Sequence, residues 1–102
     1  MRYNYCMLVV RRLIWDAWNT AHIARHDVTP DEVGELCQAD PLVQEGKKGR
    51  LAVSGMTSAG RFLIAILDPE PEPGTYYPVT AHPASGKYRR IYEQEKGKEE
   101  AA

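Results

Sequence analysis

The sequence is short of the features that identify several classes of protein. It has only two cysteines, Cys6 and Cys37, which lack CxxC spacing and therefore indicate neither a disulfide framework nor a zinc motif. We expect both to be free, buried small side chains. The apolar run at residues 6–10 meets Arg11 and Arg12, so it is too short to span a membrane and lacks the order of a secretory signal. A cytoplasmic protein is expected.

An excess of charge of one sign is also missing, because the net charge is −1 with histidines neutral. No global basic field marks a nucleic-acid binder. Acidic side chains gather at Asp31, Glu32, Glu35, Asp40, Glu45, Asp68, Glu70 and Glu72, and basic ones at residues 47–50, Arg61 and residues 87–90. The distribution favours two faces of opposite sign, and ordinary solvated surface charge is the alternative for any one cluster.

The composition is that of an ordinary globular domain, with 43% hydrophobic and 26% charged residues among 102. No internal repeat is present. A chain of this length is expected to form one domain. We place that domain at residues 8–96 and predict that residues 97–102 form a disordered, charged tail.

The first third of the chain predicts a strand and then two helices. β-forming residues place a strand within residues 8–15, and Asp16 offers an N-cap for a helix over residues 17–25. Helical spacing puts Asn19, His22 and His26 near one face, and Trp18, Ala21 and Arg25 near the adjacent one. We interpret Trp15 as a core residue and Trp18 as a core-edge residue.

The clearest local signal is the start of the second helix. Thr29 is the expected N-cap, Pro30 takes the first helical position and Glu32 completes a capping box. Val33, Leu36 and Cys37 then form its buried stripe. The helix should stop before Asp40, since a residue preceding proline avoids the α region.

From residue 42 onward the apolar period becomes that of strands. Strands are predicted at residues 42–44, 50–56, 61–67 and 76–80, joined by hairpin connectors and by a proline-rich loop at residues 68–74. Residues 62–67 are apolar on both faces of the predicted strand, so we place this strand at the centre of the sheet. A closing helix over residues 86–96 follows the Thr-Ala-His-Pro corner at residues 80–83, with Ser85 as its cap. The predicted fold is α+β, with two N-terminal helices packed on an antiparallel meander and a C-terminal helix.

An ordered set of residues resembles the BrnT-type toxin family over roughly residues 13–95. The set comprises Leu-Ile-Trp-Asp at residues 13–16, Asn19, His26, Val-Thr-Pro-Asp-Glu-Val at 28–33, Gly55, Gly-Arg at 60–61, Thr-Ala-His-Pro-Ala-Ser at 80–85, Arg90 and Tyr92. The resemblance implies a RelE-like fold and a ribonuclease toxin of a type II toxin–antitoxin system. It also implies that no metal or other cofactor is needed, and that the partners are RNA and a ribbon-helix-helix antitoxin. Either a homo-oligomer or a hetero-oligomer with the antitoxin is compatible with it. His82 stands where the family usually has arginine.

RNA cleavage without a metal needs a base for the 2′-OH proton, an acid for the leaving 5′ oxygen and cations for the developing charge. His82 is the first candidate for proton transfer, with a backbone-bonded corner histidine as the alternative. His26 lies where the dipole of the first helix attracts a cation, with a histidine that only satisfies the last helix carbonyls as the alternative. Arg61 is the preferred phosphate contact, with an ordinary surface cation on a strand as the alternative. The expected catalytic residues are therefore His82, His26 and Arg61, and the expected RNA-binding residues are Arg50, Lys87, Arg89, Arg90 and Tyr92.

Several alternatives stay open at the level of sequence. His22 and His26 have the i,i+4 spacing of zinc ligands, but no matched third ligand accompanies them, so we predict no metal site. Arg50 and Arg61 can lie at opposite ends of their hairpin or near one another, depending on register. At least one of Tyr88 and Tyr92 is expected to pack on the sheet rather than stack on bases. The rival to a ribonuclease is a catalytically silent module that binds nucleic acid or a partner.

Overall fold

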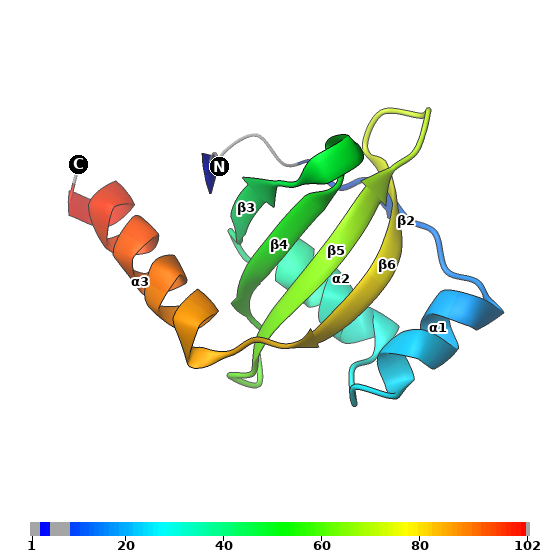
Figure 1. The fold of residues 1–102 in the computed structure, drawn as a ribbon, viewed down its shortest axis with the longest axis horizontal. Helices are drawn as coiled ribbons and strands as arrows, with labels where there is room; N and C mark the ends of the chain where they lie inside the picture. Colours follow the sequence, from blue (N-terminus) through cyan, green and yellow to red (C-terminus); the bar gives the residue numbers. More distant parts are fainter. Residues whose placement is uncertain (1–2, 5–8, 102) are drawn as a thin grey trace.

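The chain forms an α+β fold around one mixed sheet, in a computed structural model that describes residues 3–4 and 9–101 (Figure 1). The sheet order is β1-β3-β4-β5-β6-β2. The strands are β1 (Tyr3–Asn4), β2 (Arg12–Leu13), β3 (Leu42–Glu45), β4 (Leu51–Met56), β5 (Phe62–Pro69) and β6 (Thr75–Pro83). The helices are α1 (Ala17–Ala24), α2 (Pro30–Gln38) and α3 (Gly86–Ala101), with a 3₁₀ turn at Lys47–Gly49. The prediction for Cys6 lies outside the described residues.

Both N-terminal helices begin where the sequence predicts. Asp16 caps α1, and the N-cap side chain and Asn19 form a capping box. Thr29 caps α2 in the same way, with the Glu32 amide donating to Thr29 Oγ1 over 3.2 Å and the Thr29 amide donating to Glu32 Oε1 over 3.0 Å. Helix α2 ends at Gln38, before the proline. Local capping chemistry therefore fixes the N-termini of both helices.

The meander β3–β6 is antiparallel throughout, and β5 lies at its centre as predicted. One face of the sheet carries Val53, Ala65 and Ala81, which are fully buried against α1 and α2. The predicted stripe of α2 (Val33, Leu36 and Cys37) and Ile23 of α1 complete this core. Burial of this apolar face is the main contribution to the stability of the fold.

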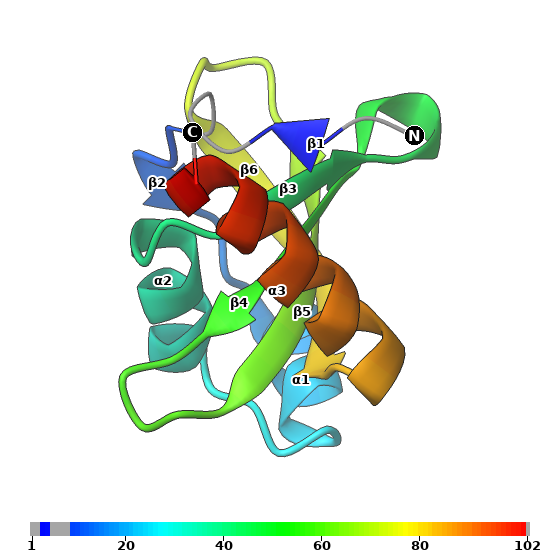
Figure 2. The same cartoon turned by 90° about the vertical axis from the view of Figure 1, so that its left-hand side faces the viewer.

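Helix α3 lies on the opposite face of the sheet from α2 (Figure 2). Side chains alternate along a strand, so Phe62 and Ile64 point away from the α2 side. The Tyr92 ring meets Phe62 edge-on with 5.3 Å between centroids, and Tyr88 lines a hollow beside Ile64. Tyr92 thus packs on the sheet. Helix α3 continues to Ala101, beyond the predicted end at residue 96. None of the helices described is both long and apolar enough to cross a membrane.

Strand β6 departs from the prediction both in its neighbour and in its length. It pairs in parallel with β2, at Arg12–Thr75 and Leu13–Tyr76, which makes the sheet mixed rather than antiparallel. It also runs to Pro83 instead of ending at residue 80. A register shift opposite Ile66 and Leu67 leaves an extra residue in β6, and such a bulge accommodates Pro78 within the strand.

Loss of the Thr29 cap should destabilise the fold. Thr29→Ala removes the acceptor for the Glu32 amide and should cost about 1 kcal/mol, within the ~0.5–2 kcal/mol typical of such caps. The free energy of unfolding is measured by urea denaturation. Thr20→Ala, at an exposed position inside α1, is the matched control and should leave the midpoint unchanged or slightly higher. A Thr29→Ala midpoint equal to that of the control would contradict the role of the cap.

Candidate active site: a histidine cluster between α1 and β6

Helix α1 lies along the part of β6 that β2 leaves unpaired (Figure 1). The side-chain amide of Asn19 donates to the carbonyl of Pro78, and His22 Nε2 lies 3.0 Å from Thr80 Oγ1. Successive contacts lie about one turn apart on α1, a rise of about 5.4 Å, and two residues apart on β6, a rise of about 6.6 Å. The similar spacing keeps the helix and the strand in contact from one pair to the next. The same spacing brings His26 beside His82.

Asn19 is the buried polar centre of this attachment. It is fully inaccessible to solvent, and its Nδ2 donates over 3.0 Å both to the Ile14 carbonyl and to the Pro78 carbonyl. Its Oδ1 accepts the Asp16 amide over 2.8 Å. The backbone N–H of Asn19 in turn donates to Asp16 Oδ1. This bond and the bond from the Tyr77 hydroxyl lower the pKa of Asp16. One side chain thereby joins the chain before α1, the helix itself and β6.

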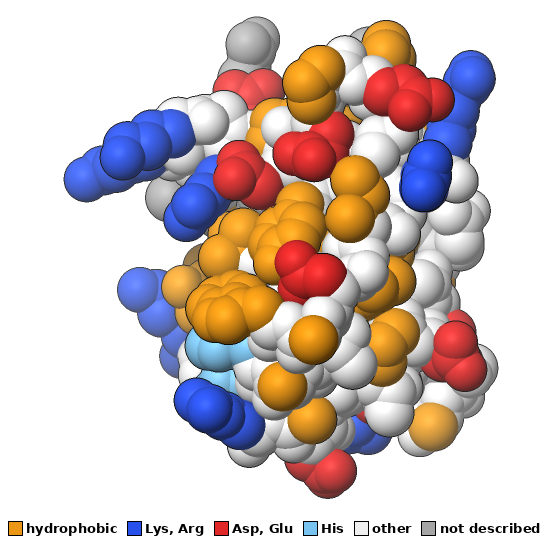
Figure 3. All heavy atoms as spheres, turned by 90° about the vertical axis from the view of Figure 1, so that its right-hand side faces the viewer, with side chains coloured by type: hydrophobic (Ala, Val, Ile, Leu, Met, Phe, Trp, Pro, Cys, Tyr) orange, Lys and Arg blue, Asp and Glu red, His pale blue; other side chains and the backbone are white. Residues whose placement is uncertain are grey.

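Four rings form a continuous row on this side of the molecule. Trp18 stacks on His22 with 5.0 Å between ring centroids and 9° between planes. His22 meets His26 edge-on at 5.5 Å, and His26 meets His82 edge-on at 5.7 Å. Histidine side chains are visible beside a large hydrophobic patch and several cationic side chains in Figure 3. All three histidines of the sequence are therefore gathered at one place, which we call the histidine cluster.

The hydrogen bonds of the cluster distinguish the three rings. His82 Nδ1 lies 3.0 Å from the Pro83 carbonyl, which can only accept, so Nδ1 carries the proton and Nε2 of the neutral ring is left with a lone pair. His22 is tied to the Thr80 hydroxyl. His26 is exposed and follows the C-terminal end of α1, whose dipole attracts a cation. The backbone-bonded corner predicted as the alternative for His82 is thus present, and it leaves Nε2 available.

The turn after α1 sets the position of His26. Val28 donates to the Ile23 carbonyl and Asp27 to the Ala24 carbonyl, the pair of bonds found in a Schellman motif. Asp27 adopts a positive φ of 60°, as that motif requires. Ile23 and Val28 are both buried, which supplies the hydrophobic contact that usually accompanies it.

Arg61 is not a free phosphate contact in this structure. Its guanidinium donates to Glu32 Oε2 over 2.7 Å and to the Asp27 carbonyl over 2.8 Å. Burial tends to raise the pKa of Glu32, but the bonds from Arg61 and Thr29 outweigh it, so the pKa of Glu32 is lowered. Arg61 therefore braces the turn that carries His26 against the start of α2.

The remaining predicted RNA-binding residues lie on other elements. Arg50 precedes β4 and pairs with Asp68 over 3.7 Å, whereas Arg61 precedes β5, so the two lie at opposite ends of the β4–β5 hairpin. Arg89 pairs with Glu93 within α3. Lys87 and Arg90 are exposed, and neither has an ion pair among the described residues. Tyr92 is engaged with Phe62. The residues of α3 (Lys87, Arg89, Arg90 and Tyr92) follow His82 closely in sequence. Arg50 lies at the other end of the β4–β5 hairpin.

Two residues of this site were missed or misinterpreted from sequence. Trp18, interpreted as a core-edge residue, is 57% exposed, because it extends from α1 beyond the edge of the sheet. Its i,i+4 spacing to His22 was the available signal. Thr80 was not singled out, and only the register of β6 reveals its contact with His22.

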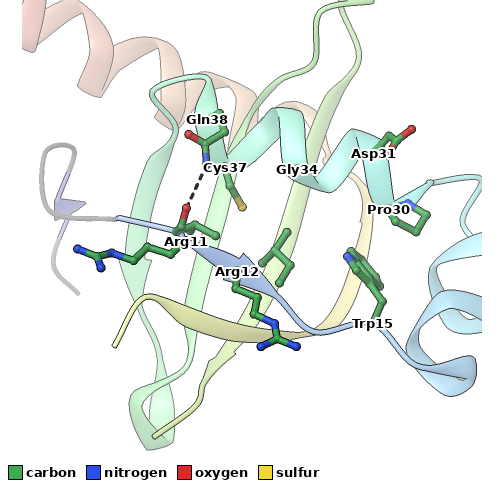
Figure 4. A pocket seen from close by; sticks show the side chains of 10 residues that line it. Arg11, Arg12, Trp15, Pro30, Asp31, Gly34, Cys37 and Gln38 are labelled. Carbon is green, nitrogen blue, oxygen red and sulfur yellow. Dashed lines mark hydrogen bonds between the residues drawn. The ribbon is translucent and has the colours of Figure 1, made fainter. Parts of the chain in front are cut away.

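Away from the histidine cluster, a groove of about 460 Å³ lies between β2 and α2 (Figure 4). Arg11, Arg12 and Asp31 are among its lining residues, and the Cys37 sulfur points toward it. Burial raises the pKa of Cys37 to about 11, so this free thiol stays protonated and is a poor nucleophile. The groove has no histidine in its lining and is the weaker candidate for catalysis.

The three histidines of the cluster are not arranged to hold a metal ion. Across residues 3–4 and 9–101, no group of three or more His, Cys, Asp or Glu side chains is arranged to hold a metal ion. Within the cluster, the residues available for chemistry are three imidazoles, a threonine hydroxyl and an indole ring. Such a set can transfer protons and can contact an anion or an aromatic ring.

The Arg61–Glu32 brace predicts a specific pH dependence of stability. Because the folded-state pKa of Glu32 is lowered, its contribution is present above the unfolded pKa and disappears as the pH falls through the folded pKa. Glu32→Gln keeps the hydrogen-bonding shape but removes the charge, so Tm at pH 7 should fall by roughly 2–6 °C. Wild type and variant should converge as the pH falls through the lowered folded-state pKa of Glu32.

Glu93→Gln is the control, since Glu93 makes an exposed pair with Arg89. Its Tm should match wild type across the same pH range, which thermal unfolding followed by circular dichroism will measure. A Glu32→Gln difference that stays constant from neutral to acidic pH would mean that the charge of Glu32 does not stabilise the brace.

Comparison with known proteins identifies no relative: no family model, curated protein or solved structure matches the chain. Its function is therefore inferred from the geometry of the histidine cluster together with the resemblance in sequence.

Proposed function

We propose that the chain is a metal-independent endoribonuclease that cleaves RNA through the 2′-OH. The observation that carries this proposal is the 5.7 Å separation of the His26 and His82 rings, which come from different elements and were singled out separately in the sequence. Two imidazoles this close can reach the same phosphodiester group. Imidazoles titrate near neutral pH, so one can accept a proton while the other donates.

The hydrogen bond of His82 and the position of His26 after α1 support different roles for the two rings. His82, with its proton held on Nδ1 by Pro83, presents the Nε2 lone pair that takes the proton from the 2′-OH. The 2′ oxygen then attacks phosphorus, and the bond from phosphorus to the 5′ oxygen breaks. His26, at the end of the α1 dipole, protonates that oxygen as it leaves. The products are a 2′,3′-cyclic phosphate and a 5′-hydroxyl, and the two histidines have exchanged protonation states.

Exposed cationic residues that follow His82 in the chain favour a phosphate-bearing substrate. In this proposal His26 meets the developing negative charge, and Lys87 and Arg90 contact the backbone of the flanking nucleotides. Arg61 acts as a positioning residue, because it holds the turn of His26 through the Asp27 carbonyl. This role replaces the direct phosphate contact expected from sequence.

The resemblance in sequence extends the proposal to the biological class. We infer a BrnT-like toxin with a RelE-like fold, which a ribbon-helix-helix antitoxin inhibits. The α+β order of two helices, an antiparallel meander and a closing helix is compatible with that class. The rival is a silent binding module, and it differs from the ribonuclease only in the absence of turnover.

The proton-transfer roles give the main test. His82→Ala should lower the cleavage rate by about 10²–10⁴-fold in the presence of a chelator while leaving affinity for a 2′-O-methyl RNA nearly unchanged. His82→Arg should also be inactive, because arginine stays charged at any working pH. His26→Ala should remove the basic limb of a bell-shaped rate profile between about pH 5 and 8.

His22→Ala is the matched control, because it removes a ring of the same cluster that has no assigned proton transfer. It should retain a pH-dependent rate, even if the rate is lower. An active His82→Ala variant with a pH-independent rate would exclude the proposed chemistry. Lack of cleavage by the wild-type chain, alongside normal RNA binding, would favour the silent module.

The antitoxin is expected to cover the cationic start of α3. Charge reversal at Arg90 should weaken binding to the small protein encoded in the neighbouring reading frame by at least about tenfold, since complementary charge steers and holds such partners. Lys47→Glu, in the 3₁₀ turn between β3 and β4, should have little effect. Equal losses from the two reversals, measured by calorimetry, would place the interface elsewhere.

A further inference from the structure

Trp18 is an exposed aromatic ring held in a fixed orientation. It is 57% exposed, yet its indole stacks on His22, with 5.0 Å between centroids and 9° between planes. His22 is itself fixed by its bond to Thr80. One face of the indole is therefore supported, and the other is accessible. A large ring exposed in this way is a common feature of a binding surface.

Cationic side chains accompany the apolar ones on the face that carries Trp18. Arg25, the C-cap of α1, lies seven residues after Trp18, is exposed and has no ion pair among the described residues. His22 and His26 follow on the same row of rings. In Figure 3, cationic side chains border the hydrophobic and histidine side chains of this face. An aromatic plane beside positive charge fits a nucleobase with its phosphate better than it fits an apolar protein segment.

We propose that Trp18 forms a stacking subsite for an unpaired nucleobase next to the scissile phosphate. This inference rests on the proposed function only for the position of that phosphate. Trp18 and His22 both lie between the free face of the indole and His26, so a base stacked on Trp18 and a phosphate at His26 and His82 belong to nucleotides close together along one strand. The substrate class is thereby narrowed to single-stranded RNA.

Base pairing decides which RNA can use this subsite. In a duplex, each base is covered on both faces by its neighbours and is not available to the indole. In a single strand, the base can turn out and stack, and every base offers a π-face. The subsite therefore selects strandedness more than sequence.

The binding test uses a fluorescein-labelled 2′-O-methyl oligoribonucleotide, which lacks the attacking hydroxyl, and it follows fluorescence anisotropy. Trp18→Ala should weaken binding of the single strand by about tenfold, while Trp18→Phe should retain most of the affinity because phenylalanine still stacks. Binding of the same strand within a duplex should be weaker and unaffected by either change. Thr20→Ala on α1 is the control and should match wild type.

A cleavage assay on unmodified RNA separates the two proposals. Stacking without cleavage would remove the ribonuclease but keep the subsite, whereas cleavage with unchanged single-strand affinity in Trp18→Ala would remove only the subsite. An equal loss for single strand and duplex would also overturn it. So would a change in the sedimentation of the free chain on Trp18→Ala without any change in RNA affinity, because the ring would then be a protein contact.

Discussion

The carboxamide of Asn19 connects three parts of the fold, namely the segment before α1, the start of α1 and strand β6. A fully buried amide is costly unless its polar atoms are bonded, and here Nδ2 and Oδ1 bond to Ile14, Pro78 and Asp16. Along the free edge of β6, it replaces part of the hydrogen bonding that another strand would give. Helix α1 is consequently fixed in both rotation and height relative to β6. The contact of His22 with Thr80 and the approach of His26 to His82 follow from that placement.

Helix starts and strand order were predictable because their causes are local. Thr29 and Glu32 bond one another within four residues, and the apolar run at residues 62–67 indicates a strand that is covered on both faces, as at the centre of a sheet. The parallel pairing of β2 with β6 was not predictable in this way. It joins residues about sixty positions apart and depends on how the whole intervening chain packs. The end of β6 was predicted too early because a proline was expected to stop the strand. Pro83 instead forms the last pair with β5, a position where the strand tolerates a residue without a backbone N–H.

The candidate site was predictable in its residue types more than in its contacts. Helical spacing placed Asn19, His22 and His26 near one face, and the structure confirms that this side meets β6. The partner of Arg61 could not be deduced, since Glu32 was assigned to a capping box and its second oxygen was free to bind a distant cation. The exposure of Trp18 was likewise hidden, because a tryptophan in a short amphipathic helix is more often buried.

The bulge in β6 has a consequence for how the chain tolerates variation. The proline-rich connection between β5 and β6 joins the sheet at the end remote from His82, and the extra residue near Pro78 lies between that connection and the histidine. Alternation beyond the bulge is set by pairing with Ile64 and Ile66, not by the path of the connection. Insertions or deletions among residues 71–73, which leave the bonds of Gly74 to Arg11 and Arg12 in place, can therefore be absorbed before they reach the His82 end of the strand. The segment is a natural point for grafting peptides or labels onto an otherwise unaltered protein.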